Sequence, residues 1–316
     1  MVEPSSHKFG DHDLQEVLVW MPQVQSADSV FWIVFIHGGA WRDPTITARN
    51  FAEPAVSILL SDTAPELRIP EGKTLAIASL SYRLSPHPSY PQDPETAPHS
   101  SLRIAKHPDH LDDVCSGIAV LRREYGLSDH RYILVGHSCG ATLAFQALKR
   151  HVETGSPAPR ALAGLAGIYD IGRLLENHKD GPYAEVYASF IKGAYGEVEK
   201  VWAHASPCRF YEHGCGDSDS HSVSWNKLCS RRTFLLVTAD GDELVEPEQC
   251  EEMKYALTAR HETHPADDVG ETQGCRYSEM SVEGGHDEMW QQGDRMVKVI
   301  QRLFMILAAT GIFETV

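Results

Sequence analysis

The chain has 316 residues, of which 42% are hydrophobic, 23% charged and 9% aromatic. These proportions are those of an ordinary globular protein, so they exclude a wholly disordered, collagen-like or coiled-coil chain. The net charge of −16 repels phosphate backbones and anionic lipid, so we expect neither nucleic acid nor a membrane surface as a partner. The N-terminus lacks a signal-peptide pattern, and no apolar run reaches the roughly 18 residues of a transmembrane helix. With the odd count of seven cysteines, this predicts a cytoplasmic protein with reduced thiols.

Short β-rich segments alternate with helical patterns along the chain. We expect strands over residues 15–21, 31–36, 74–80, 132–135, 161–168 and 233–237, and helices over 48–60, 111–125, 141–150, 247–260 and 291–307. Compact apolar runs of this length suit strands that are buried on both faces of a parallel sheet. The alternation predicts a mostly parallel, doubly wound α/β sheet in one domain spanning residues 1–316. A polar turn separates the first two strands, which could therefore be antiparallel.

Two long segments depart from this alternation. Residues 85–108 contain six prolines, which predicts an extended loop. Residues 171–230 carry no clear strand pattern, and we interpret them as a helical and loop insertion that caps one end of the sheet.

The sharpest local signal lies where the strand that ends at Val135 runs into a helix. Between them stands Gly136-His137-Ser138-Cys139-Gly140, a G-x-S-x-G turn of the kind that exposes a nucleophilic serine. A Cβ at either glycine would collide with the neighbouring strand or helix, and the turn forces Ser138 into a strained conformation. The Cys139 amide would stand at the helix N-terminus, where it can face a developing oxyanion. Taken alone, the pattern also suits a glycine-rich turn with a serine cap.

A second glycine pair follows the apolar strand at 31–36. The run is His37-Gly38-Gly39-Ala40-Trp41, and glycines at a strand's carboxyl end let main-chain amides turn toward a ligand. A loop in this place, upstream of the serine turn, supplies the second oxyanion donor of serine hydrolases with this topology. The alternative of a Gly-Gly hairpin is weakened because residues 40–44 do not form a returning strand.

An acid and a base follow the last two apolar strands. Asp240, Asp242 and Glu243 compete for the acid, and the distance from the strand end favours Asp242, with Asp240 capping the turn. His286 stands out among 17 histidines because it follows two glycines, the last strand and the candidate acid. The resulting chain order, Ser138 then Asp242 then His286, is that of α/β-hydrolases. Four features in this order and context favour a serine hydrolase far more than any one of them.

At this point the chain resembles the α/β-hydrolases over nearly all its length and, more narrowly, the fungal kynurenine formamidases. The carrying segments are the H-G-G-x-W motif at 37–41 with Asp43-Pro44, Tyr82-Arg83-Leu84-Ser85-Pro86, His107-Pro108-Asp109-His110 with Asp112-Asp113-Val114, the serine turn, and Gly167-Ile168-Tyr169-Asp170-Ile171. The resemblance implies Ser138 as nucleophile, Asp242 as acid, His286 as base, and the amides of Gly38, Gly39 and Cys139 as oxyanion donors. It also suggests a homodimer. The segments 85–106 and 208–228 look longer than in the family, and a pocket reshaped by them would change the substrate and not the hydrolytic chemistry.

The implied reaction converts N-formyl-L-kynurenine to L-kynurenine and formate, a step of tryptophan degradation, through a formyl-enzyme on Ser138. It needs a small-molecule substrate and no cofactor. Trp41 could wall the acyl pocket or stack on the aryl ring, although simple core packing explains it equally well. The amino-acid end of the substrate needs polar partners, for which the candidates are Arg42, Tyr82, Arg83 and Tyr169.

Other activities are less well supported by the residues. Cys208, His213, Cys215, His221 and Cys229 cluster, but without a C-x-x-C pair they indicate zinc only weakly, and we assign no metal. The dinucleotide motif G-x-G-x-x-G is absent. A broad carboxylesterase of the lipase-like H-G-G type would use the same catalytic residues, and only the H-G-G-x-W form argues against it. A catalytically inactive binding member of the fold is the remaining alternative, disfavoured by the intact triad.

Overall fold

A computed structural model describes residues 3–22, 29–67, 69, 72–210, 225–258 and 275–309. Its strands are β1 (Ser5–Lys8), β2 (Glu16–Trp20), β3 (Val30–Ile36), β4 (Thr74–Leu80), β5 (Tyr132–His137), β6 (Ala161–Leu165), β7 (Thr233–Ala239) and β8 (Arg276–Val282). Its helices are α1 (Ala48–Leu59), α2 (Asp109–Tyr125), α3 (Cys139–Thr154), α4 (Ile171–His178), α5 (Ala184–Tyr195), α6 (Glu199–Ala205), α7 (Trp225–Cys229), α8 (Glu248–Thr258), α9 (Glu288–Gln291) and α10 (Asp294–Ala309). Among the described helices, none is long and apolar enough to cross a bilayer.

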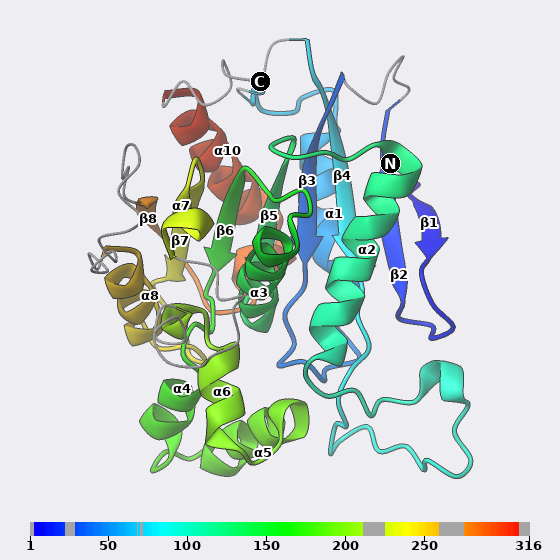
Figure 1. Cartoon of the computed structure of the whole chain (residues 1–316), viewed down its shortest axis with the longest axis vertical. Coiled ribbons are helices and arrows are strands. Elements are labelled where there is room, and N and C mark those ends of the chain that lie inside the picture. The colour runs from blue at the N-terminus through cyan, green and yellow to red at the C-terminus, as the bar shows by residue number, and fades with distance from the viewer. Residues whose placement is uncertain are drawn as a thin grey trace.

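The strands form one sheet of eight in the order β1-β2-β4-β3-β5-β6-β7-β8. The pairs β1–β2 and β2–β4 are antiparallel, and every later neighbouring pair is parallel. The sequence prediction of a mostly parallel, doubly wound sheet is confirmed. Because the six strands from β4 to β8 in this order run the same way, their carboxyl ends meet at one edge of the sheet, toward the lower part of Figure 1.

Both faces of the sheet are covered, which explains the continuous apolar runs in the sequence. Along β3, Trp32, Val34 and Ile36 belong to one core, whereas the alternating Ile33 and Phe35 belong to the core on the opposite face. Helices α2 and α3 cover the first face, and α1 and α10 cover the second (Figure 1). A strand that is buried on both sides has no polar face, so its sequence shows no alternation.

The expected loop at 85–108 holds only a short 3₁₀ turn, η2 (His99–Ser101). In residues 171–205 the chain forms α4, α5 and α6, which lie beyond the carboxyl edge of the sheet (Figure 1). Residues 211–224 of the expected insertion lie outside the described residues. The helices therefore stand over the edge where the ends of β3, β5 and β7 meet.

Several local details differ from the sequence predictions. The strand at 16–20 runs antiparallel to β3, as expected, but it pairs with β4, which lies between the two in the sheet. The short edge strand β1 has no apolar run to reveal it. The terminal helix expected at 291–307 is α10, and the short helix α9, which was not expected, precedes it and is separated from it at Gly293, which has φ of +78°.

The prediction that all cysteines are reduced was also wrong. Cys229 and Cys275 form a disulfide whose α-carbons lie 4.8 Å apart, a separation typical of such bonds. The two residues are 46 positions apart in the chain, so only the packing of α7 beside the start of β8 brings the thiols together. Cys115, Cys139, Cys208 and Cys250 are free thiols.

Close contact between α3 and β3 generates the first prediction. A Cβ added at Gly140 would lie 2.3 Å from the Ile36 carbonyl oxygen and 2.5 Å from that of His37, so backbone would have to move. Gly140→Ala is expected to lower the free energy of unfolding by at least about 3 kcal/mol, measured by urea denaturation. Gly193→Ala, inside α5 where an added Cβ meets nothing within 4 Å, should instead raise it by up to about 1 kcal/mol. Equal stability of the two variants would contradict this packing.

Candidate active site

Ser138 occupies the tight turn between β5 and α3. Its φ of 54° and ψ of −125° place it in a region that residues with a side chain rarely adopt. An added Cβ at Gly136 would come within 2.4 Å of the Gly140 carbonyl oxygen, and Gly140 itself packs on the end of β3. Both glycines are therefore required to bring strand, turn and helix together. The strained turn directs Ser138 toward a cavity, which it helps to line.

The H-G-G loop lies directly against this turn. A Cβ at Gly38 would meet the His137 ring at 2.7 Å and the Ser138 Cβ at 3.2 Å, so only glycine allows this approach. The chain then turns through positive φ at Gly39 (98°), Ala40 (49°) and Trp41 (59°). Gly39 and Ala40 line the cavity beside Ser138. The Cys139 amide is the first of helix α3, where its N–H has no partner within the preceding helical turn.

Buried side chains support this loop from behind. The Tyr82 hydroxyl lies 3.0 Å from the His37 carbonyl oxygen and 3.1 Å from that of Gly38, and its ring stacks on the His37 ring at 4.4 Å. Burial lowers the pKa of His37 to about 4, so the ring is neutral and its Nδ1–H donates to the Gly38 carbonyl oxygen at 2.8 Å. The Trp41 amide donates to the Cys139 thiol at 3.3 Å, which ties the loop to α3.

Asp242 and His286 form a buried hydrogen-bonded pair next to the cavity. The two Asp242 carboxylate oxygens lie 3.0 and 2.9 Å from His286 Nδ1. The Asp242 Oδ1 atom also accepts hydrogen bonds from the amides of Leu244 and Val245, both at 2.9 Å. Because Nδ1–H is directed at the carboxylate, Nε2 is the ring nitrogen that can accept a proton.

The other two carboxylates that were candidates for the acid do not contact the His286 ring. Asp240 is exposed and hydrogen-bonds the Ser281 hydroxyl. The Glu243 Oε2 atom accepts from the His286 amide at 3.1 Å, so this side chain orients the backbone of the histidine and not its ring. Of the three, Asp242 is the carboxylate that contacts the His286 imidazole.

His137 adds a contact that the sequence did not indicate. Its Nε2–H donates to the His286 carbonyl oxygen at 3.0 Å, and the two rings lie 4.5 Å apart. Burial and the neighbouring His286 lower the pKa of His137 well below its usual range, so it is a neutral donor. His137, the residue that precedes Ser138 in the serine turn, therefore also holds the backbone of the loop that carries His286.

The cavity above Ser138 has a volume of about 410 Å³, which lies within the usual range for small-molecule sites. Ser138 and His286 both line it, together with Gly39. The opposite wall comes from α5 through Val186, Tyr187 and Phe190, and from its N-cap Tyr183. The cavity is thus enclosed between the carboxyl edge of the sheet and the helices that follow β6.

Four of the five residues expected to contact substrate, namely Trp41, Tyr82, Arg83 and Tyr169, do not line this cavity. Trp41, Tyr82 and Tyr169 are each at most 1% exposed. Trp41 packs edge-on against Tyr195 and beside Phe190, so it supports a cavity wall from behind. Tyr169 fills a slot left by two glycines, since a Cβ at Gly164 would lie 2.2 Å from its hydroxyl. These aromatic side chains build the core beneath the site.

Arg83 also lies away from the cavity. Its Nε and Nη2 atoms donate to the two carboxylate oxygens of buried Asp113, at 2.8 and 3.0 Å. This pairing anchors the end of β4 to α2 and leaves the guanidinium committed to a structural role.

Arg42 is the candidate cation that the structure places on the cavity wall. Its Nη1–H donates to the Ser189 hydroxyl at 2.9 Å, and its guanidinium lies 5.6 Å from the centre of the Phe190 ring. Neighbouring Asp43 lines the cavity as well. The sequence reasoning missed His87, Tyr187 and Phe190, which come from segments whose pattern carries no catalytic motif; His87 lies in the long proline-rich loop.

Only part of the cysteine–histidine cluster that weakly indicated zinc lies within the described residues. Residues 213, 215 and 221 lie outside the described residues. Cys229 is bound to Cys275, and the Cys208 thiol lies buried 3.7 Å from the Asp170 carboxylate. Within the described chain, His137, His286 and Asp287 offer ligand atoms within 4.8 Å of one another, but both histidines already hold hydrogen bonds of the site.

The buried position of Tyr82 generates a second prediction. Tyr82→Phe should lower the free energy of unfolding by about 1–3 kcal/mol, because the carbonyl oxygens of His37 and Gly38 lose their buried donor. Tyr183→Phe, at a side chain that is 60% exposed, should change it by less than about 0.5 kcal/mol. Chemical denaturation of both variants measures this. A Tyr82→Phe protein with unchanged stability and a raised KM would restore the substrate-contact role.

Comparison with known proteins agrees with this architecture. A family profile described as alpha/beta hydrolase fold matches residues 33–246. Among solved structures, esterase B of Lactobacillus rhamnosis superposes with a TM-score of 0.63 at 13% identity, covering 99% of this chain and 87% of that one. Carboxyl esterase 2 of Tuber melanosporum superposes with a TM-score of 0.58 at 15% identity, covering 92% and 81%. At these identities the likeness concerns the fold alone.

Sequence relatives are much closer. A kynurenine formamidase-like hydrolase of Fusarium equiseti is 38% identical over 308 residues, which cover 95% of this chain and 92% of that protein. A kynurenine formamidase of Aspergillus versicolor is 34% identical over 285 residues, covering 84% and 86%. One from Meyerozyma guilliermondii is 30% identical over 259 residues, covering 80% of each. The chain belongs to the kynurenine formamidase family of α/β-hydrolases.

Proposed function

We propose that the protein is a serine hydrolase that cleaves N-formyl-L-kynurenine to L-kynurenine and formate. The observation that carries the proposal is the Asp242–His286 hydrogen bond at 2.9 Å, beside a cavity that Ser138 and His286 line together. The three residues follow β5, β7 and β8. Along the chain they occur in the order serine, acid, histidine, which is that of α/β-hydrolases. The relatives named kynurenine formamidase support the choice of substrate.

The reaction begins when Ser138 Oγ attacks the formyl carbon and His286 Nε2 takes the hydroxyl proton. Asp242 keeps the proton of the imidazole on Nδ1 and stabilises the imidazolium that forms. His286 Nε2–H then protonates the arylamine nitrogen as the C–N bond breaks, and L-kynurenine leaves. Water attacks the formyl ester of Ser138 while His286 Nε2 takes a proton from it. Collapse of the tetrahedral species then releases formate as His286 returns that proton to Ser138 Oγ.

The negative charge of each tetrahedral species needs hydrogen-bond donors. The amides of Gly38, Gly39 and Cys139 serve this role in the proposal, since the H-G-G loop and the start of α3 flank Ser138. Each such donor contributes about 10²- to 10³-fold in kcat in comparable enzymes. Tyr82 and His37 would support the role indirectly, because they fix the carbonyl groups of the same loop.

Arg42 and Asp43 suit the zwitterionic amino-acid end of the substrate. The Arg42 guanidinium donates to the neutral Ser189 hydroxyl, and a substrate carboxylate would add a charged partner. The Asp43 Oδ1 atom accepts from the Thr45 amide and hydroxyl, at 2.8 and 2.7 Å, which holds this carboxylate on the cavity wall. Phe190 and Tyr187 would then face the aryl ring.

A broad carboxylesterase is the second candidate, and the many apolar side chains of the cavity wall favour it. Ile46, Leu174 and Val186 would accept an alkyl or acyl chain as readily as an aryl group. The comparison of kcat/KM for N-formyl-L-kynurenine with that for p-nitrophenyl acetate decides between the two. A preference for the formamide supports the proposal, whereas rapid ester cleavage with negligible formamidase activity would assign the esterase.

The triad assignment generates a third prediction. Ser138→Ala should lower kcat by roughly 10⁴- to 10⁶-fold and Asp242→Asn by roughly 10³- to 10⁴-fold, because nucleophile and imidazole orientation are lost. Asp240→Asn is the matched control, since this exposed carboxylate bonds only Ser281 among the described side chains, and it should change kcat by less than about threefold. Steady-state kinetics on the three purified variants test this. A larger loss for Asp240→Asn than for Asp242→Asn would move the acid.

The role of Arg42 generates a fourth prediction. Arg42→Met keeps much of the stem that packs beside Phe190 but removes the charge, and should raise KM for N-formyl-L-kynurenine by about 10- to 100-fold. Formanilide, which has the formyl-arylamine bond but no amino-acid end, provides the control. Its KM should change by less than about threefold in the same variant. An equal loss for both substrates would mean that Arg42 supports the cavity and does not bind the carboxylate.

A further inference from the structure

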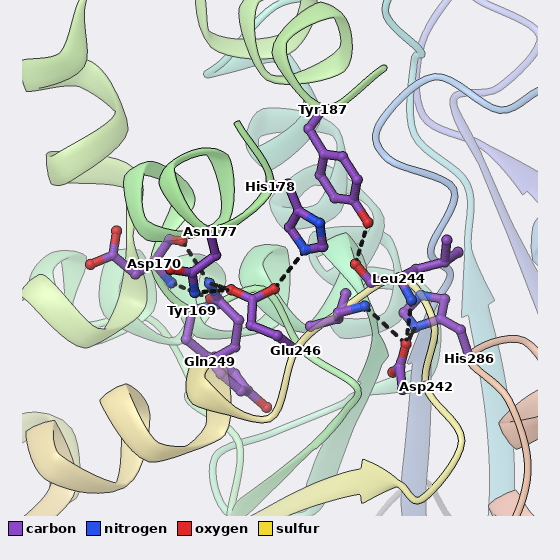
Figure 2. Close-up of polar contacts among 11 residues, drawn as sticks. Tyr169, Asp170, Asn177, His178, Tyr187, Asp242, Leu244, Glu246, Gln249 and His286 are labelled. Atoms are coloured by element: carbon purple, nitrogen blue, oxygen red, sulfur yellow. Dashed lines mark hydrogen bonds and ion pairs between the residues drawn. The ribbon is translucent and has the colours of Figure 1, made fainter. Parts of the chain in front are cut away.

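The loop that carries Asp242 is held by the helices that form the opposite wall of the cavity. This acid loop, residues 242–246, joins β7 to α8 and contacts α4 and α5 through polar side chains (Figure 2). None of the partners on those helices belongs to the triad. Their contacts reach the loop at Leu244, whose amide bonds Asp242, and at Glu246, two residues further along.

The first tether is the Tyr187 hydroxyl, which donates to the Leu244 carbonyl oxygen at 2.6 Å. The amide of that same Leu244 donates to Asp242 Oδ1 at 2.9 Å. Tyr187 therefore holds the peptide segment that in turn holds the carboxylate. Burial, with Coulombic repulsion from Glu246 and Asp242, raises the pKa of Tyr187 to about 12, so the phenol remains a proton donor at physiological pH.

The second tether is Glu246, at the end of the acid loop. Its Oε2 atom lies 3.0 Å from His178 Nε2, and its Oε1 atom accepts from Asn177 Nδ2 at 2.9 Å and Gln249 Nε2 at 3.0 Å. Two of these three partners lie in the last turn of α4. An ionised carboxylate only accepts hydrogen bonds, so His178 must present Nε2–H to it.

Gln249 fixes the other end of α4 to the same region. Its Oε1 atom accepts from the amides of Tyr169 and Asp170, each at 2.8 Å, and its Nε2–H donates to the Asp170 carbonyl oxygen at 3.0 Å. Asp170 is the N-cap of α4, and Gln249 is only 1% exposed. The start of α4 is thus anchored to α8, and its last turn is anchored to the acid loop.

The two tethers are joined to each other by stacked rings. The rings of His178 and Tyr187 lie 3.9 Å apart and within 7° of parallel. Figure 2 shows Tyr187 reaching toward Leu244 and His178 toward Glu246 from the same side of the acid loop. Tyr187 also lines the cavity, so one side chain belongs both to the cavity wall and to the support of the acid.

We propose that Tyr187 and His178 are positioning residues for catalysis, which hold the acid loop so that Asp242 stays aligned with His286. The inference rests on the triad proposed above but does not depend on which acyl substrate is cleaved. It makes the cap helices part of the catalytic alignment, because α4 and α5 supply the tethers. A residue that acts in this way changes kcat for every substrate by a similar factor, whereas a substrate contact changes one substrate's KM.

Tyr187→Phe is the direct test, because it removes the hydroxyl and keeps the ring that lines the cavity and stacks on His178. It should lower kcat by roughly 3- to 10-fold, the loss expected for one hydrogen bond, for both N-formyl-L-kynurenine and p-nitrophenyl acetate. KM should stay within about twofold for each substrate. Tyr255→Phe is the matched control, since this tyrosine is 63% exposed on α8 and should leave both constants unchanged.

His178→Phe is the second variant, because it keeps a ring against Tyr187 and removes the donor to Glu246. It should lower kcat by a smaller factor than Tyr187→Phe, since Asn177 and Gln249 still hold the carboxylate. The double variant should lose less than the product of the two single losses, because both tethers act on one loop.

A spectroscopic readout separates positioning from a general structural role. The low-field proton resonance of the His286 Nδ1–H···Asp242 bond, assigned by its loss in Asp242→Asn, should move upfield or broaden in Tyr187→Phe and stay in place in Tyr255→Phe. Wild-type kcat with both substrates and an unmoved resonance in Tyr187→Phe would overturn the inference. A raised KM for one substrate alone would also overturn it and make Tyr187 a substrate contact.

The results that would contradict the proposed function differ from those that would contradict this inference. A wild-type protein that cleaves p-nitrophenyl acetate but not N-formyl-L-kynurenine would contradict the formamidase proposal, while the ester kinetics and the proton resonance would still decide the role of Tyr187. A wild-type protein without the resonance and without turnover of either substrate would remove the triad and this inference with it.

Discussion

The turn from β5 into α3 is the constraint on which the rest of the site depends. It leaves no room for a Cβ at Gly136 or Gly140, and it holds Ser138 at φ of 54°. Because α3 can then approach the end of β3 closely, the H-G-G loop lies against the serine turn, and a Cβ at Gly38 would be crowded by His137 and Ser138. The strain at one residue is maintained by two packed cores on either side of the sheet, which fix the strand and helix independently.

Around this turn the structure arranges loops that are far apart in the chain. Asp242 and His286 follow β7 and β8, which pair in parallel, so their loops leave the sheet at the same edge and meet. His137 and Glu243 then hold the backbone of His286 from two sides. On the far side of the cavity, α4 and α5 contact the acid loop through His178 and Tyr187. The polar contacts of the acid loop therefore connect the sheet edge to the helices that enclose the cavity.

Sequence reasoning predicted the parts of the site that are local in the chain. The glycines of the serine turn and the H-G-G loop were identified because close approach excludes every other residue there. Asp242 was preferred over Asp240 by its distance from the strand end, and it is the carboxylate that reaches His286. Aromatic residues were misread: Tyr82 and Tyr169 adjoin recognisable motifs, but a buried ring that supports a loop and one that binds a ligand have the same sequence signature.

The sequence by itself determined the alternation of strands and helices, the family, and the residues on the two glycine turns, because these depend on local sterics and on order along the chain. Only the tertiary structure decided that β2 pairs with β4, that Cys229 meets Cys275, and which side chains enclose the cavity. Those facts depend on contacts between segments distant in sequence, where many pairings satisfy the same local pattern. The tether from Tyr187 to Leu244 spans 57 residues, and nothing in either segment alone indicates it.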